Sequence, residues 1–189
     1  MNIVKQVTKG KRINRASLKS RRLIIKALLE LMEEHPFVEI TIKEITDRAE
    51  LVRRTFYGHF SSKDDVLRSY IDGLGSQLSE IISDTGEPLL HYASRQFFTF
   101  WSEHANFLRM LKNNGLFLPV DAIERFLNNL EMTLPVKRWK NLQDRDHTFS
   151  CAYMAGGLLN LLYSWIDRAS GETSEEMAEA FISLIGGER

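Results

Sequence analysis

The stretch TIKEITDRAELVRRTFYGHFSSKDDVL, residues 41–67, decides the fold of this chain. Its first four residues form a capping-box pattern. In this pattern the Thr41 hydroxyl accepts a hydrogen bond from the backbone amide of Glu44, and the Glu44 carboxylate accepts one from the backbone amide of Thr41. This pattern predicts a short helix. A second short helix is expected from residue 53 to residue 58 or 59, after a three-residue connection. Two short helices joined in this way predict a helix-turn-helix.

The flanking sequence has apolar residues at helical spacing, and only four prolines and eleven glycines interrupt the chain. We therefore expect an all-α protein. A long first helix is predicted to begin at the cap Ser17 and to end at Pro36, and a long fourth helix is predicted to begin at the cap Ser62. Later helices are expected over about residues 89–110, 122–134 and 146–169, followed by a final helix capped by Ser174.

The charge of the chain is balanced overall but divided along its length. Lys and Arg number 25, as do Asp and Glu. Residues 1–72 hold fifteen basic and ten acidic side chains, and residues 73–189 hold ten and fifteen. The first 26 residues contain nine basic residues and no acidic one, which is typical of an arm that binds a polyanion and equally of a solvated tail.

Two further features limit the class of protein. Cys151 is the single cysteine, so an internal disulfide framework and a thiolate metal cage are excluded. The N-terminus has no apolar signal segment, and no stretch approaches the roughly 18 apolar residues that a membrane span needs. We expect a cytoplasmic protein with no membrane partner, no cofactor and no metal site.

The segment RRTFYGHFSSK, residues 53–63, has the side chains that a DNA-reading helix needs. The second helix of a helix-turn-helix enters the major groove through its first turn, where arginine suits guanine and threonine can meet a thymine methyl group. Phe56 and Phe60 are expected in the core. The expected DNA contacts are Arg53, Arg54 and Thr55 to bases, and Tyr57, His59 and Lys63 to phosphates.

This combination resembles the TetR family of transcriptional regulators. The resemblance covers roughly residues 18–71, and its most specific element is the Phe-Tyr-Gly-His-Phe step followed by Ser-Lys-Asp-Asp and an apolar helix. It implies a small three-helix DNA-binding domain that a long fourth helix joins to a larger helical domain for ligand binding and dimerisation. It also implies a sequence-specific regulator, more often a repressor, with Thr41 and Lys43 against the DNA backbone.

The chain departs from the family pattern at two positions of the turn. Glu50 stands where the family usually has glycine, which predicts either a left-handed residue or a different turn. Val52 replaces the usual serine cap, which removes a side-chain cap worth about 1 kcal/mol. The expected domains are a basic arm (1–16), the helix-turn-helix domain (17–65) and an effector-binding and dimerisation domain (66–189).

The resemblance also implies a homodimer on a palindromic operator, with an interface formed by the last two helices. Small residues that allow close helix approach and apolar residues in excess of one core support this expectation. The recognition helices would then lie about 34–36 Å apart, one turn of DNA. The expected interface residues are Ala152, Ala155, Gly156, Leu158, Leu162, Trp165 and Phe181.

The family further implies a small-molecule effector, here an apolar or aromatic one, in the larger domain. The candidate pocket residues are Phe97, Phe100, Trp101, His104, Phe117, Tyr153 and Met154. The same aromatic residues equally suit an ordinary core.

Two other classes of function remain open. One is a co-regulator that acts mainly through a protein partner. The departures from the family pattern at Glu50 and Val52 leave this class open. The other is an enzyme that uses His147 and Cys151, which lie four residues apart, but no orienting group accompanies them; we therefore expect no catalytic residues. His91 and His104 lack ligands at metal spacing and are interpreted as packed or surface residues.

Overall fold

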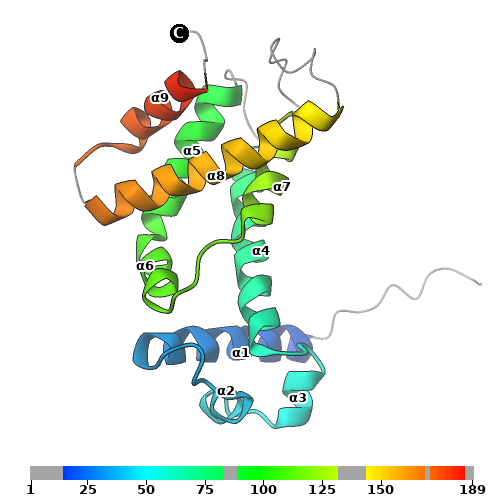
Figure 1. Ribbon diagram of the computed structural model, residues 1–189. Coiled ribbons are helices and arrows are strands. Elements are labelled where there is room, and N and C mark those ends of the chain that lie inside the picture. The colour runs from blue at the N-terminus through cyan, green and yellow to red at the C-terminus, as the bar shows by residue number, and fades with distance from the viewer. Residues whose placement is uncertain (1–14, 83–88, 132–143, 169–170, 186–189) are drawn as a thin grey trace, which may run out of the picture. The chain divides into compact units, whose positions relative to one another are not determined.

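The computed structural model describes residues 15–82, 89–131, 144–168 and 171–185, and the regular elements in these ranges are all helices (Figure 1). The all-α prediction is confirmed. The helices are α1 (Arg15–Glu34), α2 (Ile42–Arg48), α3 (Arg53–Tyr57), α4 (Lys63–Ile82), α5 (Leu89–Glu103), α6 (Ala105–Asn113), α7 (Val120–Glu131), α8 (Asp144–Arg168) and α9 (Ser174–Leu184).

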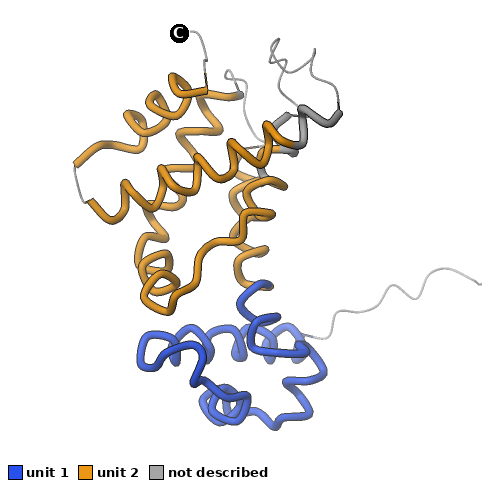
Figure 2. The backbone as a smooth tube through the Cα atoms, viewed as in Figure 1, with its two compact units in different colours: residues 1–68 blue, residues 69–189 orange. Residues whose placement is uncertain are grey.

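The chain divides into two compact units, residues 1–68 and residues 69–189 (Figure 2). We refer to them as unit 1 and unit 2. Helix α4 runs across the boundary. The predicted basic arm lies outside the described residues, except for Arg15 and Ala16, which are part of α1.

Unit 1 is a three-helix domain closed by the start of α4. Helix α1 packs against α2 and α3, which also pack against each other. Its core side chains are fully buried because each lies on the inward stripe of an amphipathic helix. They are Ile24, Leu28, Ile45, Phe56 and Val66.

Unit 2 is a helical bundle in which α5 packs most extensively on α9, and α7 packs on α8. Helix α5 also contacts α6, α7 and α8. The predicted helix over residues 89–110 is interrupted at His104, where α6 begins without a side-chain cap. The largest fully buried side chains of unit 2 are Phe97, Phe98, Leu78, Leu108, Leu111, Leu158 and Leu162.

Helix caps follow the sequence signals in two of four cases. The Thr41 capping box is present, and Ser62 Oγ accepts from the Asp65 amide at 3.1 Å. The other two predicted caps are wrong. Ser17 lies inside α1, which already includes Arg15. The cap of α9 is Thr173, which forms a capping box with Glu176 and leaves Ser174 as the first helical residue.

None of the helices in the described ranges combines the length and the apolar character that crossing a bilayer requires.

Candidate nucleic-acid interface

The turn between α2 and α3 is closed by a left-handed glutamate. Glu50 has φ +54°, and its amide donates to Asp47 O at 3.2 Å while the Leu51 amide donates to Thr46 O at 2.9 Å. These two bonds form a Schellman motif, whose left-handed position usually carries glycine. The predicted left-handed residue is therefore present, and the turn keeps its helix-turn-helix geometry without glycine. The departure at Glu50 thus gives the co-regulator alternative no structural support.

The first turn of α3 presents two arginines to solvent. Arg53 and Arg54 are exposed and Thr55 is half-buried. Within the described part of the chain, neither guanidinium is paired with a carboxylate. Val52 sits at the N-cap with extended backbone and no side-chain cap, as the sequence predicts.

Helix α3 is anchored by aromatic rings on its inner face. Phe56 is fully buried, and its ring lies 6.1 Å from that of the buried Phe60, between centroids. On the other side, Tyr57 is 59% exposed although its ring edge meets Phe56 at 5.5 Å. His59 is half-buried. The two phenyl rings expected in the core are therefore buried, whereas of the two groups expected outward Tyr57 is exposed and His59 only half-exposed.

Helix α2 is fixed to α1 by Arg48, a residue that the sequence analysis did not single out. The Arg48 guanidinium donates to both carboxylate oxygens of Glu34, at 2.9 and 2.6 Å. These hydrogen bonds lower the pKa of Glu34 and raise the pKa of Arg48. A bidentate pair of this kind restricts both side chains to one geometry, so it sets the position of α2 and of the turn that follows.

The two residues at the start of α2 are exposed but already have partners. The Thr41 hydroxyl and amide both donate to Glu44 Oε2 at 2.7 Å, which lowers the pKa of the Glu44 carboxyl. Lys43 forms a surface ion pair with Asp47, with Nζ 3.4 Å from Oδ2. Contact of either side chain with DNA would have to replace or share these bonds.

Lys63 is part of the domain's internal structure. Its Nζ donates to the carbonyl oxygens of Phe37, Val38 and Ile40 at 2.6, 3.0 and 2.8 Å, and it lies 4.7 Å from the centre of the Phe37 ring. An ammonium group has three donors, and all three are used. The expectation of a Lys63 ammonium available for phosphate is therefore not met: the side chain ties the α1–α2 loop to the start of α4.

The candidate pocket residues of unit 2 do not form one set. Phe97, Phe100, Trp101 and Met154 are buried, and the His104 ring is stacked on Phe100 at 4.4 Å. Phe117 and Tyr153 are 57% and 82% exposed. The last two therefore do not line an enclosed cavity within this chain, since their side chains lie at its surface.

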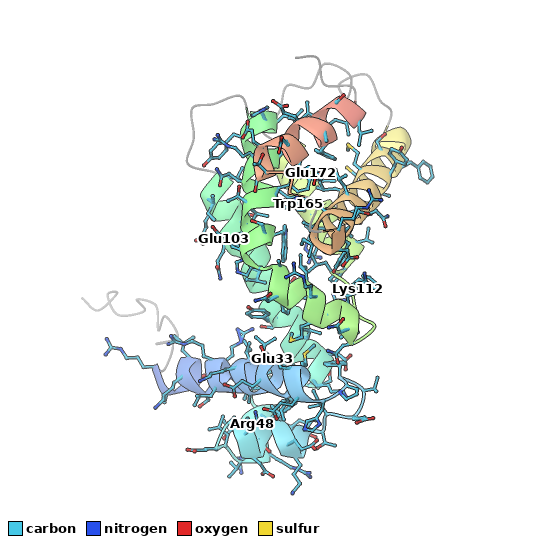
Figure 3. The ribbon with its side chains drawn as sticks, turned by 90° about the vertical axis from the view of Figure 1, so that its left-hand side faces the viewer. Glu33, Arg48, Glu103, Lys112, Trp165 and Glu172 are labelled. Carbon is cyan, nitrogen blue, oxygen red and sulfur yellow. The ribbon has the colours of Figure 1, made fainter. Side chains whose placement is uncertain are left out.

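The candidate interface residues also separate into two groups. Ala155, Leu158, Leu162 and Phe181 are buried within unit 2 itself, so the prediction that they form a surface for a second subunit is wrong. Ala152 is exposed, Gly156 is half-buried, and Trp165 is half-buried with its Nε1 donating to Glu172 O at 3.0 Å (Figure 3).

Another face of α8 is apolar and exposed. Phe149 and Tyr153 are 62% and 82% exposed, and Gly157 is exposed one turn further on. On α9, Leu184 is 76% exposed. We call the three α8 residues Phe149, Tyr153 and Gly157 the outer face of unit 2. Of these residues only Tyr153 was predicted from the sequence to be functional, and it was predicted to line a pocket, because both faces of α8 are apolar enough to be buried.

The structure does not support the alternative in which Cys151 is the nucleophile of an enzyme. Cys151 is buried, whereas a catalytic thiol has to reach substrate. The side chain of His147 lies outside the described residues.

Comparison with known proteins places unit 1 in a family. Residues 24–70 match the family described as bacterial regulatory proteins, tetR family. The activator of the dhaKLM operon, DhaS, from Lactococcus lactis is 22% identical over 89% of this chain and 90% of its own length. The regulator EthR from Mycobacterium tuberculosis is 32% identical over 42% of this chain and 37% of its own length.

Solved structures extend the likeness to unit 2. A TetR regulator from Streptococcus agalactiae superposes with TM-score 0.66 at 18% identity over 93% of this chain and 97% of its own. The fatty acid degradation regulator FadR from Bacillus halodurans gives TM-score 0.63 at 16% identity, over 89% and 99% of the two chains. At these identities the likeness concerns the fold alone.

Proposed function

Because this chain belongs to the tetR family of bacterial regulatory proteins and is a DNA-binding transcriptional regulator, we propose that it acts as a homodimer on a palindromic operator and responds to a small molecule. We further propose that residues 17–65 bind DNA, that residues 66–189 dimerise and bind the effector, and that the protein works in the cytoplasm, where the chromosome lies.

The observation that carries the DNA-reading role is the structure of α3. Arg53 and Arg54 are exposed in its first turn, beside the buried anchor Phe56. Arginine can donate two hydrogen bonds to the O6 and N7 atoms of guanine. We propose that these arginines and Thr55 read bases, that Tyr57 and His59 contact phosphates, and that Thr41 and Lys43 contact the backbone once their present bonds open. Lys63 acts by holding the loop.

The test is a fluorescence anisotropy titration of the dimer with DNA from upstream of its own gene. Affinity should fall steeply with salt, because binding releases counterions from the phosphates. Arg53→Ala and Arg54→Ala should each weaken binding about tenfold or more, and Tyr57→Phe should weaken it less. Arg125→Ala, which removes an exposed guanidinium from α7 of unit 2, is the control. Equal loss in all four variants, or no salt dependence, would refute the assignment.

For the second subunit we propose the outer face of unit 2 as the interface. Phe149 and Tyr153 lie one turn apart on α8 and are 62% and 82% exposed, and adjoining exposed apolar side chains often mark a protein–protein contact. A β-carbon built on Gly156 or Gly157 would meet nothing within 4 Å, so a partner helix could approach this backbone closely. Small residues at a helix crossing allow such an approach.

Light scattering coupled to gel filtration tests this interface. Tyr153→Arg should convert the dimer to a monomer, because the new charge would be buried without a partner. Phe117→Arg changes a similarly exposed aromatic residue outside α8 and should leave the dimer intact. A dimer that survives Tyr153→Arg and Gly157→Leu would exclude this face.

The effector site is proposed within the aromatic cluster of α5. Trp101 is 3% exposed, and its Nε1 is a buried donor with no hydrogen-bond partner in the described part of the chain. A buried polar group without a partner is costly, so we propose that an acceptor atom of an apolar or aromatic effector meets it, next to Phe97, Phe100, His104 and Met154. Effectors found by thermal-shift screening of aromatic acids and ketones should lose affinity in Trp101→Phe.

We propose repression as the direction of regulation, because a dimer that covers a turn of promoter DNA blocks access to it. The relative DhaS is named as an activator. A promoter–reporter assay in cells with and without the protein distinguishes the two directions.

A further inference from the structure

Three possible metal ligands meet between α5 and α9, within unit 2. His91 lies on α5, and Glu175 and Glu179 lie one turn apart on α9. His91 Nε2 is 3.4 Å from Glu175 Oε1, and one ligand atom from each of the three residues lies within 4.8 Å of the others. His91 and Glu175 are half-buried and Glu179 is exposed, so the group is open to ions from solvent.

The separation of these atoms suits a zinc ion. Zinc binds histidine nitrogen at about 2.0–2.1 Å and carboxylate oxygen at about 2.0–2.2 Å in a tetrahedron. The edge of such a tetrahedron is roughly 3.3–3.5 Å long, which matches the distance from His91 Nε2 to Glu175 Oε1. Rotation of the exposed Glu179 side chain would bring the other two edges to this length. Water would complete the four ligands.

An ion pair favours this orientation of Glu175. Arg95 Nε lies 3.6 Å from Glu175 Oε2, on the oxygen that does not face His91. The distance is that of an ion pair rather than a hydrogen bond, and its attraction favours the side-chain orientation in which the other oxygen faces His91. Helices α5 and α9 also form the most extensive helix contact of the unit, so the backbones that bear the ligands are fixed relative to each other.

We propose that His91, Glu175 and Glu179 form a site for a divalent transition metal of the zinc type. Imidazole combined with carboxylate favours zinc, nickel or cobalt over magnesium and calcium, which prefer oxygen ligands alone. The bound ion joins α9 to α5 and stabilises unit 2. This site is separate from the aromatic cluster of α5 and does not depend on the DNA-binding or effector proposals.

The test uses the full chain, stripped of metal with a chelator and then titrated with Zn²⁺ by calorimetry. We expect one ion per chain at this site, and a rise in the unfolding temperature at saturating Zn²⁺, because a ligand that binds only the folded state stabilises it. Co²⁺ should give the visible absorption of a tetrahedral site. His91→Gln and Glu175→Gln should each weaken Zn²⁺ binding at least about tenfold, and Glu179→Gln should weaken it less.

The matched control is His35→Gln. His35 Nε2 lies 4.0 Å from Glu34 Oε2, but Glu34 is held by Arg48, so this pair should bind no ion tightly. All changed residues are partly or fully exposed, so the variants should fold, and circular dichroism checks that they do. Three results would overturn the proposal: wild-type protein that binds no Zn²⁺, affinity that survives His91→Gln, or an equal loss in His35→Gln.

Discussion

Unit 1 and unit 2 are both helical, but they hold their helices in different ways. Helices α2 and α3 of unit 1 are seven and five residues long, too short to be stable alone. Polar clamps hold α2 and the loop before it: Thr41 with Glu44, Arg48 with Glu34, and Lys63 with the α1–α2 loop. Helix α3 is anchored by the buried ring of Phe56. Helix α8 of unit 2 has 25 residues and is held by a buried apolar face.

This difference between the units indicates which substitutions each unit tolerates. In unit 1 the clamps hold α2, which packs against the reading helix α3, so losing one polar group can disturb DNA binding without touching a DNA contact. In unit 2 the helices bury broad apolar faces, with ion pairs such as that of Arg125 with Asp72 between helices, and exposed apolar side chains on the outer side can change without loss of the fold. We therefore expect the clearest effects in unit 1 for substitutions at residues that hold the helices in place but do not touch DNA.

The largest effect is expected for Phe56→Ala. Phe56 is fully buried, and truncating a buried phenylalanine costs roughly 3–5 kcal/mol, comparable to the whole stability of a small domain. Unit 1 should unfold and DNA binding should be lost. All three tryptophans, at 101, 139 and 165, lie in unit 2, so their fluorescence transition should persist. Tyr57→Ala, at a neighbouring exposed residue, is the control for the unfolding of unit 1 only, because Tyr57 is itself a proposed phosphate contact.

A smaller effect is expected for Lys63→Met, which keeps the length of the side chain but removes the ammonium group. Hydrogen bonds to charged groups contribute about 2 kcal/mol, and hydrogen exchange of the loop around Phe37 should become faster. Lys43→Met removes only a surface ion pair and should cost less than about 1 kcal/mol. If Lys63→Met weakens DNA binding with no change in loop exchange, Lys63 contacts phosphate instead of holding the loop.

How much could be predicted from sequence differs between the two units. In unit 1 the signals are local: the capping box at Thr41, the left-handed position at Glu50 and the alternation of Phe56 and Tyr57 each depend on neighbours within a few residues. The clamps by Arg48 and Lys63 were missed because their partners lie 14 to 26 residues away, at a spacing that carries no pattern.

In unit 2 the sequence predicts where the helices lie, but not which face of each helix is buried. Leu158 and Leu162 were predicted at the surface and are buried, whereas Tyr153 was predicted in a pocket and is exposed. An apolar helix such as α8 offers two faces that could be buried, and packing against α7 selects one. The group of His91 with Glu175 was invisible for the same reason, since α5 and α9 meet only in the folded unit.

An effect on stability smaller than that of Lys63→Met is expected for two substitutions in the turn between α2 and α3, Glu50→Gly and Val52→Ser. A non-glycine residue in the left-handed region costs roughly 1–2 kcal/mol, so Glu50→Gly should stabilise unit 1 by about 1 kcal/mol. Val52→Ser should add about 1 kcal/mol by capping α3, because Val52 is 68% exposed and already has the extended backbone of an N-cap. Urea unfolding followed by circular dichroism measures both. Thr55→Ser, inside α3, should give no comparable gain.

The smallest effect is expected when the pH is lowered. The loss of stability should differ between the two units because the pKa values of their carboxylates differ. In unit 1 the pKa of Glu34 is lowered by its hydrogen bonds from Arg48, that of Glu44 by Thr41, and that of Asp65 by Ser61. In the described part of unit 2 only Glu176 has a lowered carboxyl pKa, through Thr173. A carboxyl whose pKa is lower in the folded state contributes stability above its unfolded pKa and loses it as the pH falls.

The ordinary values of these groups are 4.5 for Glu and 3.8 for Asp, so stability should be constant from pH 7 to about pH 5 and then decline. The decline should be steeper for unit 1, followed by hydrogen exchange of residues 41–60, than for unit 2, followed by tryptophan fluorescence. Glu44→Gln should reduce the decline of unit 1, because it removes one of the three titrating groups, and Glu103→Gln, an exposed residue of α5, should not. Parallel declines in both units would mean that acid acts through overall charge rather than through these clamps.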